Sequence, residues 1–331
     1  MAQRTIYLDI NHWYALGRAA QGNPDKPEHA KLLTVLQDEV DAGRLVIPLS
    51  SITYEELTEN PRDQLREPTA EVMWRLSKAA TIAPASKIVD EELVVELNRR
   101  FGRPRWPAKV RKFGHGIGFA FGLGRLRTVV PPERRSEIEA QAGMTIPDLE
   151  ALAELFMLKT PGSLRSRIPG FDPNVWRREA DAELAALKGM LANVHGGDTS
   201  ITGRPVDAVY ARQLGGDIRE NFSRALATAG YADTWTYPLK DGAETTDFIK
   251  HLPTQRVATE LKIHYAKNTQ TPWKINHLRD IAALSVAIPY TDAVVTDRDV
   301  RSAATQRTHL DKEFNTAVFS QLTELADFLG T

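Results

Sequence analysis

The chain of 331 residues carries 42 basic and 43 acidic side chains, and its 42% of hydrophobic residues is ordinary for a globular protein. Its length suits a sizeable core or two domains, and the absence of cysteine excludes disulfides, thiolate nucleophiles and cysteine-based metal sites. Because there is no cationic leader and no run of about 18 apolar residues, we expect a cytoplasmic protein without a membrane span.

The first 85 residues alternate short apolar runs with helical patterns. Residues 4–11 predict a strand that ends in an acid, Asp9. A second strand, at 45–49, leads directly into residues 50–57, where a Ser/Thr cap ahead of a glutamate predicts the start of a helix. Further helices are expected at 12–20, 32–40 and 69–80, and a third strand at 81–84. Strands that alternate with helices indicate a parallel sheet covered by helices.

From about residue 86 to 245, strand signals almost vanish and the sequence predicts a large all-helical insertion. Its helices are expected at 91–100, 136–141, 148–158, 175–194 and 206–229. The glycine-rich run 114–124 does not fit a nucleotide-binding loop, because no clear strand precedes it and Phe121 occupies the place of the third glycine. We expect a flexible loop or a tight helix-packing segment there.

The segment 276–300 returns to the α/β pattern. Asp280 heads a helix that stops near Pro289. Residues 293–296 are small and β-branched, which is typical of a buried parallel strand, and Asp297 follows at its carboxyl end. This segment therefore predicts a second strand that ends in an acid.

A helix at 254–266, a last strand at 316–320 and a closing helix at 322–329 complete the expected elements. The sheet is thus assembled from both ends of the chain. We expect an α/β core formed by residues 1–85 and 250–331, with residues 86–249 inserted as the helical part.

Asp9, Glu56, Asp280 and Asp297 share one kind of position, the carboxyl end of a strand or the first turn of a helix. In one parallel sheet, such positions meet at a single edge. An acid at a helix start is by itself more often a cap, so it is the joint placement that points to a site. Clustered carboxylates are the oxygen ligands that Mg²⁺ or Mn²⁺ prefers, and such ions activate water and neutralise a phosphate.

Several neighbours are expected to support these acids through hydrogen bonds or as additional ligands. They are Asn11, Asn276, Thr296 and Asp299, with His277 as a further candidate whose alternative role is in capping or at the surface. Glu55 adjoins Glu56 and leaves the second acid ambiguous. Asp292 begins the strand that Asp297 ends, about 16 Å away at 3.3 Å per residue, which is too far for direct ligation.

At these positions the chain resembles the PIN domain nucleases. The motifs that carry the resemblance are Leu8-Asp9-Ile10-Asn11, Ser50-x-x-Thr53-x-x-Glu56-Leu57, Asp280-Ile281-x-x-Leu284 and Val294-Val295-Thr296-Asp297-x-Asp299-Val300. The resemblance implies a PIN-like parallel sheet and a metal-dependent nuclease, most often acting on RNA, in which these acids hold Mg²⁺ or Mn²⁺. The family pattern also favours Glu56 over Glu55, because Glu56 precedes Leu57. The inserted helical part departs from the compact family fold.

The segment 99–112 contains many basic residues, no acid and two aromatic residues. Its candidate nucleic-acid contacts are Arg99, Arg100, Arg103, Arg105, Trp106, Lys109, Arg111 and Lys112. Arginine and lysine supply phosphate contacts and aromatic rings stack on unpaired bases, so RNA is the expected partner. The alternative is a solvated basic loop that pairs with acidic helices of the same insertion.

The resulting hypothesis is an endoribonuclease with a Mg²⁺ or Mn²⁺ site and an insertion that binds substrate or a partner. An inhibitory protein or a second copy of the chain is a further expected partner. Two alternatives stay open. One is a non-catalytic RNA-binding or scaffold protein in which the acids cap helices, and the other is a metal-dependent DNA nuclease or phosphatase on the same acidic edge.

Overall fold

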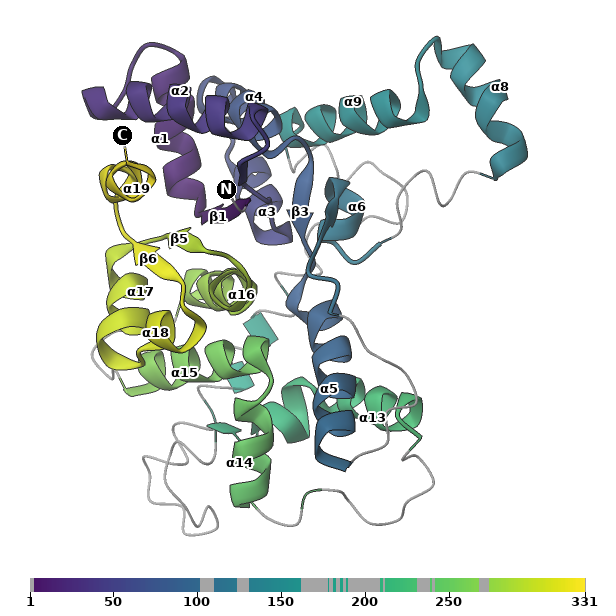
Figure 1. The fold of residues 1–331 in the computed structure, drawn as a ribbon, viewed down its shortest axis with the longest axis vertical. Coiled ribbons are helices and arrows are strands. Elements are labelled where there is room, and N and C mark those ends of the chain that lie inside the picture. The colour runs from purple at the N-terminus through teal and green to yellow at the C-terminus, as the bar shows by residue number, and fades with distance from the viewer. Residues whose placement is uncertain are drawn as a thin grey trace. The chain divides into compact units, whose positions relative to one another are not determined.

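The computed structural model describes residues 3–101, 110–123, 131–161, 209–210, 212–230, 239, 242–267 and 274–330, together with isolated residues between 178 and 189. The chain forms two compact units, whose helices and strands are labelled in Figure 1. The first unit comprises Met1–Pro84, Phe113–Pro173 and Tyr290–Thr331, and the second comprises Ala85–Lys112 and Asn174–Pro289. Residues 113–161, expected in the insertion, thus belong to the first unit, whereas 253–289, expected in the core, belong to the second.

The first unit is built on a parallel sheet of four strands in the order β2-β1-β5-β6. The strands are β1 (Arg4–Leu8), β2 (Leu45–Val46), β5 (Ala293–Val295) and β6 (Ala317–Phe319). Leu8 lies opposite Val295 in the register of β1 and β5. All of β5 is buried, as its small and β-branched residues predict. The expected α/β class and parallel sheet are therefore confirmed.

Helices pack around this sheet to form the core of the first unit. They are α1 (Ile10–Ala20), α2 (Pro27–Asp41), α3 (Ser51–Glu59), α4 (Asp63–Ser77), α17 (Arg298–Ser302), the π-helix η2 (Ala303–Arg307), α18 (Leu310–Phe314) and α19 (Leu322–Leu329). Trp13 and Leu16 of α1 are fully buried against Leu36 of α2 and the sheet. Gly17 lies where α1 crosses α4, so close that a Cβ would overlap the Thr69 side chain.

A second small sheet lies in the same unit, where strand β3 (Ala80–Ile82) pairs antiparallel with β4 (Phe113–His115). Strand β3 was expected, but β4 was not, because its residues Phe-Gly-His carry no strand pattern. We expected a flexible loop or helix-packing segment at 114–124, but its first two residues belong to strand β4. Helix α6 (Gly116–Ala120) follows β4, and α8 (Pro132–Ala142) and α9 (Ile146–Lys159) come after it.

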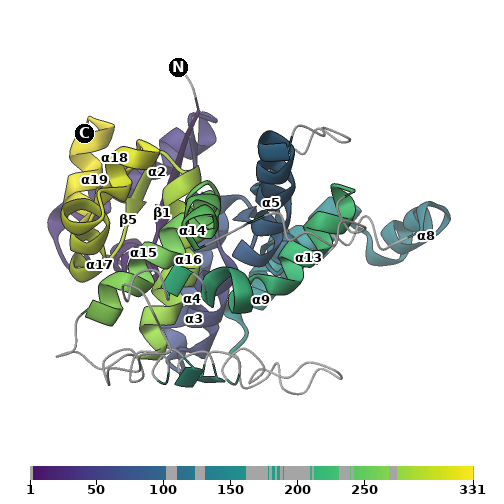
Figure 2. The same ribbon diagram turned by 90° about the horizontal axis from the view of Figure 1, so that it is seen from below.

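The second unit is helical in its described residues. Its helices are α5 (Ala85–Phe101), the π-helix η1 (Gln213–Asp217), α13 (Arg219–Thr228), α14 (Gly242–Lys250), α15 (Pro253–Lys267) and α16 (Ile275–Tyr290). Helix α13 packs against α5 (Figure 2), and Val89, Leu93, Phe222 and Phe248 are among the buried residues of this core. None of the helices in the described ranges is long and apolar enough to cross a membrane.

Candidate functional site

Asp9 and Asp297 follow neighbouring strands of the first unit. The Asp9 N–H donates to the Val295 carbonyl at 3.0 Å, so the pairing of β1 with β5 continues to Asp9 itself. Asp297 comes two residues after the end of β5. The parallel sheet therefore carries both acids at its carboxyl edge, as the sequence predicts.

The two carboxylates are held differently. Asp9 caps α1, and its Oδ1 accepts the Ile10 N–H at 2.7 Å. Asp297 occupies the cap position of α17, but its side chain accepts no capping hydrogen bond. Asn11 instead donates from Nδ2 to Asp297 Oδ1 at 3.4 Å. In the described part of the chain, Oδ2 of each aspartate has no hydrogen-bond partner, so each keeps an oxygen available for a ligand.

The charges of this pair act on each other. Burial, followed by the negative charge of Asp297, raises the pKa of Asp9 to about 6, against the lowering effect of the Ile10 N–H. Asp297 is exposed. Hard oxygen donors that repel one another suit a small divalent cation, which would offset the repulsion, so the donor set fits Mg²⁺ or Mn²⁺.

His12 joins the same region and was not predicted as a site residue. Its Nε2 lies 3.4 Å from the Thr296 carbonyl. Because a carbonyl oxygen only accepts, a hydrogen bond here requires the tautomer with the proton on Nε2. Burial lowers the pKa of His12 below its ordinary value, although the Thr296 carbonyl and Asp297 oppose the shift, so the ring is neutral near pH 7. The sequence held one indication of this role: His12 lies three residues after Asp9, in the first turn of the helix that Asp9 caps.

Glu56 lies on α3, whose start is fixed to β1. Ser50 caps α3, in agreement with the predicted helix start, and it also forms a capping box with Thr53. The buried Tyr7 hydroxyl of β1 lies 3.0 Å from Ser50 Oγ and 3.2 Å from Thr53 Oγ1. Glu56 follows one turn after Thr53 and is partly exposed.

The charges of Glu56 and Asp9 both act on the hydroxyl of Tyr7. Burial is the main cause of its raised pKa, and the charges of Asp9 and Glu56 raise it further. Both carboxylates are therefore near enough to interact with one phenol. Glu55, the other candidate for the second acid, is not among the charges that act on Tyr7.

The remaining acidic candidates are Asp280 and Asp299. Asp280 is partly exposed on α16, in the second unit, and its joining of the acidic group stays a prediction. Asp299 is exposed in the first turn of α17. Across the described residues, no group of three or more His, Asp or Glu side chains is already arranged to hold a metal ion.

The supporting candidates have defined local roles. Thr296 is buried, its N–H donates to the Phe319 carbonyl at 3.0 Å and its own carbonyl faces His12. His277 accepts the Lys274 N–H at Nδ1 across 3.3 Å, and its ring stacks on Tyr265 with centroids 4.4 Å apart. This contact at the start of α16 is the capping role considered for His277. Asn276 is exposed.

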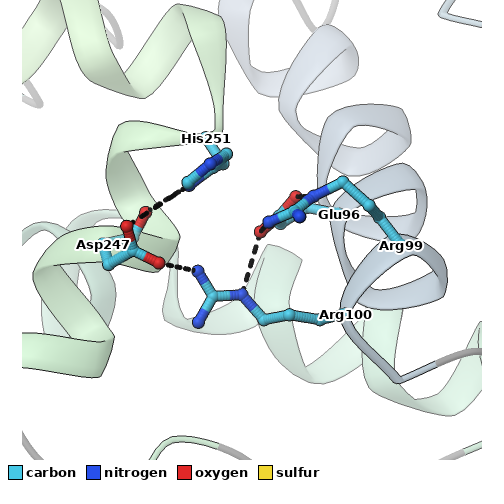
Figure 3. Close-up of polar contacts among 5 residues, drawn as sticks. All are labelled: Glu96, Arg99, Arg100, Asp247 and His251. Atoms are coloured by element: carbon cyan, nitrogen blue, oxygen red, sulfur yellow. Dashed lines mark hydrogen bonds and ion pairs between the residues drawn. The ribbon is translucent and has the colours of Figure 1, made fainter.

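Two arginines of the basic segment are engaged in ion pairs within the second unit (Figure 3). Arg99 contacts Glu96 with both Nε and an NH2 group, at 2.6 and 2.7 Å. Arg100 donates to Glu96 at 2.9 Å and to Asp247 at 2.5 Å. Their pairing with acids of the same unit matches the alternative considered for this segment, a basic stretch that neutralises its own helices.

The rest of the basic segment is described only in part. Arg103, Arg105, Trp106 and Lys109 lie outside the described residues. Arg111 is exposed, and its backbone N–H donates to the Glu91 carboxylate. Lys112 is partly exposed. An RNA-binding role for this segment remains a prediction.

Comparisons of the chain with protein-family models, with curated proteins and with solved structures find no match. The resemblance to PIN domains therefore rests on the motifs of the sequence.

Proposed function

We propose that the first unit carries a metal-dependent nuclease site that hydrolyses phosphodiester bonds, with RNA as substrate. The observation that supports it is the placement of Asp9 and Asp297 on adjacent parallel strands, each with one carboxylate oxygen that no described residue uses. Carboxyl edges of parallel sheets are where such sites are built. The choice of RNA follows from the motif resemblance and from the basic segment.

The residues of the chain take distinct roles in this proposal. Asp9 and Asp297 would ligate Mg²⁺ or Mn²⁺, and Glu56 would complete the group in the same unit. The role of Asp280, on α16 of the second unit, stays a prediction from the sequence. A bound divalent ion would polarise the scissile phosphate and lower the pKa of an attacking water. Asn11 orients Asp297. His12, through the Thr296 carbonyl, holds the segment that carries Asp297.

A non-catalytic scaffold is the second candidate, and two observations favour it. Asp9 already acts as the cap of α1, a sufficient structural reason for an acid at that position. Arg99 and Arg100 are paired with acids of their own unit. In a scaffold, replacing Asp297 would leave every binding property unchanged, because its side chain caps no helix.

The deciding experiment is cleavage of labelled single-stranded RNA, structured RNA, duplex DNA and mononucleotides, with Mn²⁺, Mg²⁺ or EDTA. Wild type is compared with Asp9→Asn, Asp297→Asn and Asp280→Asn, and with Asp327→Asn as a control at an exposed acid of α19. We expect metal-dependent cutting of RNA that the first three substitutions abolish and the control retains. Cleavage of DNA or mononucleotides instead of RNA would assign the site to the DNA nuclease or phosphatase alternative, and full activity of Asp297→Asn would refute the site.

A further inference from the structure

The second unit contains a cavity of about 210 Å³ that the acidic site does not involve. Its walls come from α5, η1, α13, α15 and α16, all within this unit. Pockets for drug-sized ligands occupy about 300 to 1,000 Å³, so this cavity suits a fragment with a single ring system. The apolar part of the lining includes Val89, Ile218 and Ile281.

Buried polar side chains form the opposite part of the lining. Gln213 donates from Nε2 to Gln255 Oε1 at 2.5 Å and accepts at Oε1 from the Lys262 ammonium at 3.3 Å. All three side chains are at most 5% exposed. Each amide nitrogen has two N–H groups, and Gln255 donates one of its own to Thr254 Oγ1 at 3.3 Å. One N–H of each amide therefore has no partner among the described residues. Buried amides beside an apolar wall are groups that fix the orientation of a polar ring.

The two charged side chains that line this cavity, Lys262 and Asp217, are paired with each other. Lys262 contacts Asp217 at 2.6 Å, and Arg212 approaches the other oxygen of Asp217 at 3.5 Å. An ammonium already neutralised by a carboxylate has little attraction left for a phosphate group. The preferred ligand is therefore uncharged.

Two further features mark the cavity as more than a packing gap. Gln213 and Asp217 are the end residues of the π-helix η1, a conformation that is rare and frequent at functional sites. At the rim, Asn221 uses Nδ2 to bind the Ser86 carbonyl at 3.1 Å and Asp90 at 2.8 Å. Its Oδ1 has no hydrogen-bond partner in the part of the chain that the structure describes.

We propose that this cavity binds one unpaired nucleobase. A base is flat, uncharged and rimmed by donors and acceptors, and it would lie against the aliphatic wall with its edge toward the amides of Gln213 and Asn221. The selection of a nucleobase among small polar rings rests on the proposed nuclease function. The second unit would then hold a base of the RNA.

The test measures the binding of adenosine, guanosine, cytidine and uridine to the full chain in EDTA. Saturation-transfer NMR detects the bound nucleoside. Ala282→Leu fills the cavity from α16, and Asn221→Ala removes the rim acceptor, whereas Ala227→Leu adds the same bulk at an exposed position of α13 as a control. We expect at least one nucleoside to bind wild type and the control, and Ala282→Leu to weaken that binding at least tenfold. A smaller loss is expected for Asn221→Ala.

The outcomes separate this proposal from the nuclease proposal. Absence of nucleoside binding by wild type, or undiminished binding by Ala282→Leu, overturns the base pocket even where RNA is cleaved. Conversely, nucleoside binding that Ala282→Leu removes supports the pocket even where no metal-dependent cleavage occurs. Asp297→Asn should bind nucleosides as wild type does, because that residue belongs to the other unit.

Discussion

Asn11 on α1 donates to Asp297, which lies 286 residues further along the chain, across 3.4 Å. The contact joins the first helix after β1 to the segment after β5. Asn11 therefore orients an acid whose carboxylate no helix cap holds.

Asn11→Ala should reduce metal-dependent cleavage by about tenfold, in the range seen when hydrogen-bond partners of metal ligands are removed. Asn11 is exposed, so the melting temperature should stay within 1 or 2 °C, about what a surface change of roughly 0.5 kcal/mol produces. The measurement is the cleavage rate as a function of Mn²⁺ concentration. Unchanged metal dependence would show that Asn11 does not orient a ligand.

Asp9→Asn should stabilise the protein in EDTA by about 1 kcal/mol, because it removes a half-buried charge that Asp297 repels. With Mn²⁺ the order should reverse, since a ligand that binds only the folded state raises its stability by about 2.7 kcal/mol at one hundred times Kd. Thermal melting with and without Mn²⁺ measures both effects. Equal Mn²⁺ stabilisation of wild type and Asp9→Asn would argue against a metal at this acid, and Asp327→Asn should behave as wild type.

Glu154 of α9 predicts a pH dependence of stability that is independent of the acidic pair. Burial raises its pKa from 4.5 to about 7, although the Ile117 N–H at 2.8 Å opposes the shift. Because the unfolded chain ionises near 4.5, this group destabilises the fold above pH 7, and stability should rise as pH falls from 7 toward 4.5. Glu154→Gln should add roughly 2 to 3 kcal/mol at pH 8 and little at pH 4.5.

Urea unfolding of both proteins between pH 4.5 and 8 measures this difference. Parallel stability curves for wild type and Glu154→Gln would contradict the assignment of the raised pKa to Glu154.

Gly17→Ala should destabilise the first unit by about 1 to 3 kcal/mol, because the added methyl group overlaps Thr69 where α1 crosses α4. Gly242→Ala is the control, since a Cβ there meets nothing within 4 Å. Urea unfolding followed by tryptophan fluorescence reports the change, with Trp13 buried in the affected core. A helix-stabilising effect of Gly17→Ala would mean that α4 can move away at little cost.

Arg100 and Arg111 should respond differently to substitution. Arg100→Ala breaks contacts with Glu96 and Asp247 and should lower stability by about 1 to 3 kcal/mol, because Glu96 is buried. Arg111 is exposed, so Arg111→Ala should leave stability unchanged and weaken RNA binding. Filter binding at two salt concentrations, together with melting curves, separates the two effects. Weaker RNA binding by a fully folded Arg100→Ala would reverse these assignments.

The sequence predicted the parts of the fold that depend on local patterns. The β-branched run before Asp297 and the apolar run before Asp9 identified β5 and β1, and the parallel-sheet rule then placed both acids at one edge. The Ser/Thr cap ahead of a glutamate at residues 50–57 likewise predicted the start of α3, although not that Thr53 completes its capping box.

Contacts between distant segments could not be predicted from local sequence patterns. Strand β4 exists because Phe113 and His115 pair with β3, and its own residues carry no strand pattern. Arg100 donates to Asp247 on another helix, and the sequence around Arg100 does not indicate this partner. His12 is an ordinary helical residue until β5 brings the Thr296 carbonyl beside it.

The pairing of β1 with β5 also has a consequence for synthesis of the protein. During synthesis, β1 acquires this neighbour only after Val295 has emerged from the ribosome, and Asn11 can bind Asp297 only when a residue 286 positions further along the chain has followed. A nascent chain therefore lacks the acidic pair until the segment after β5 has been made.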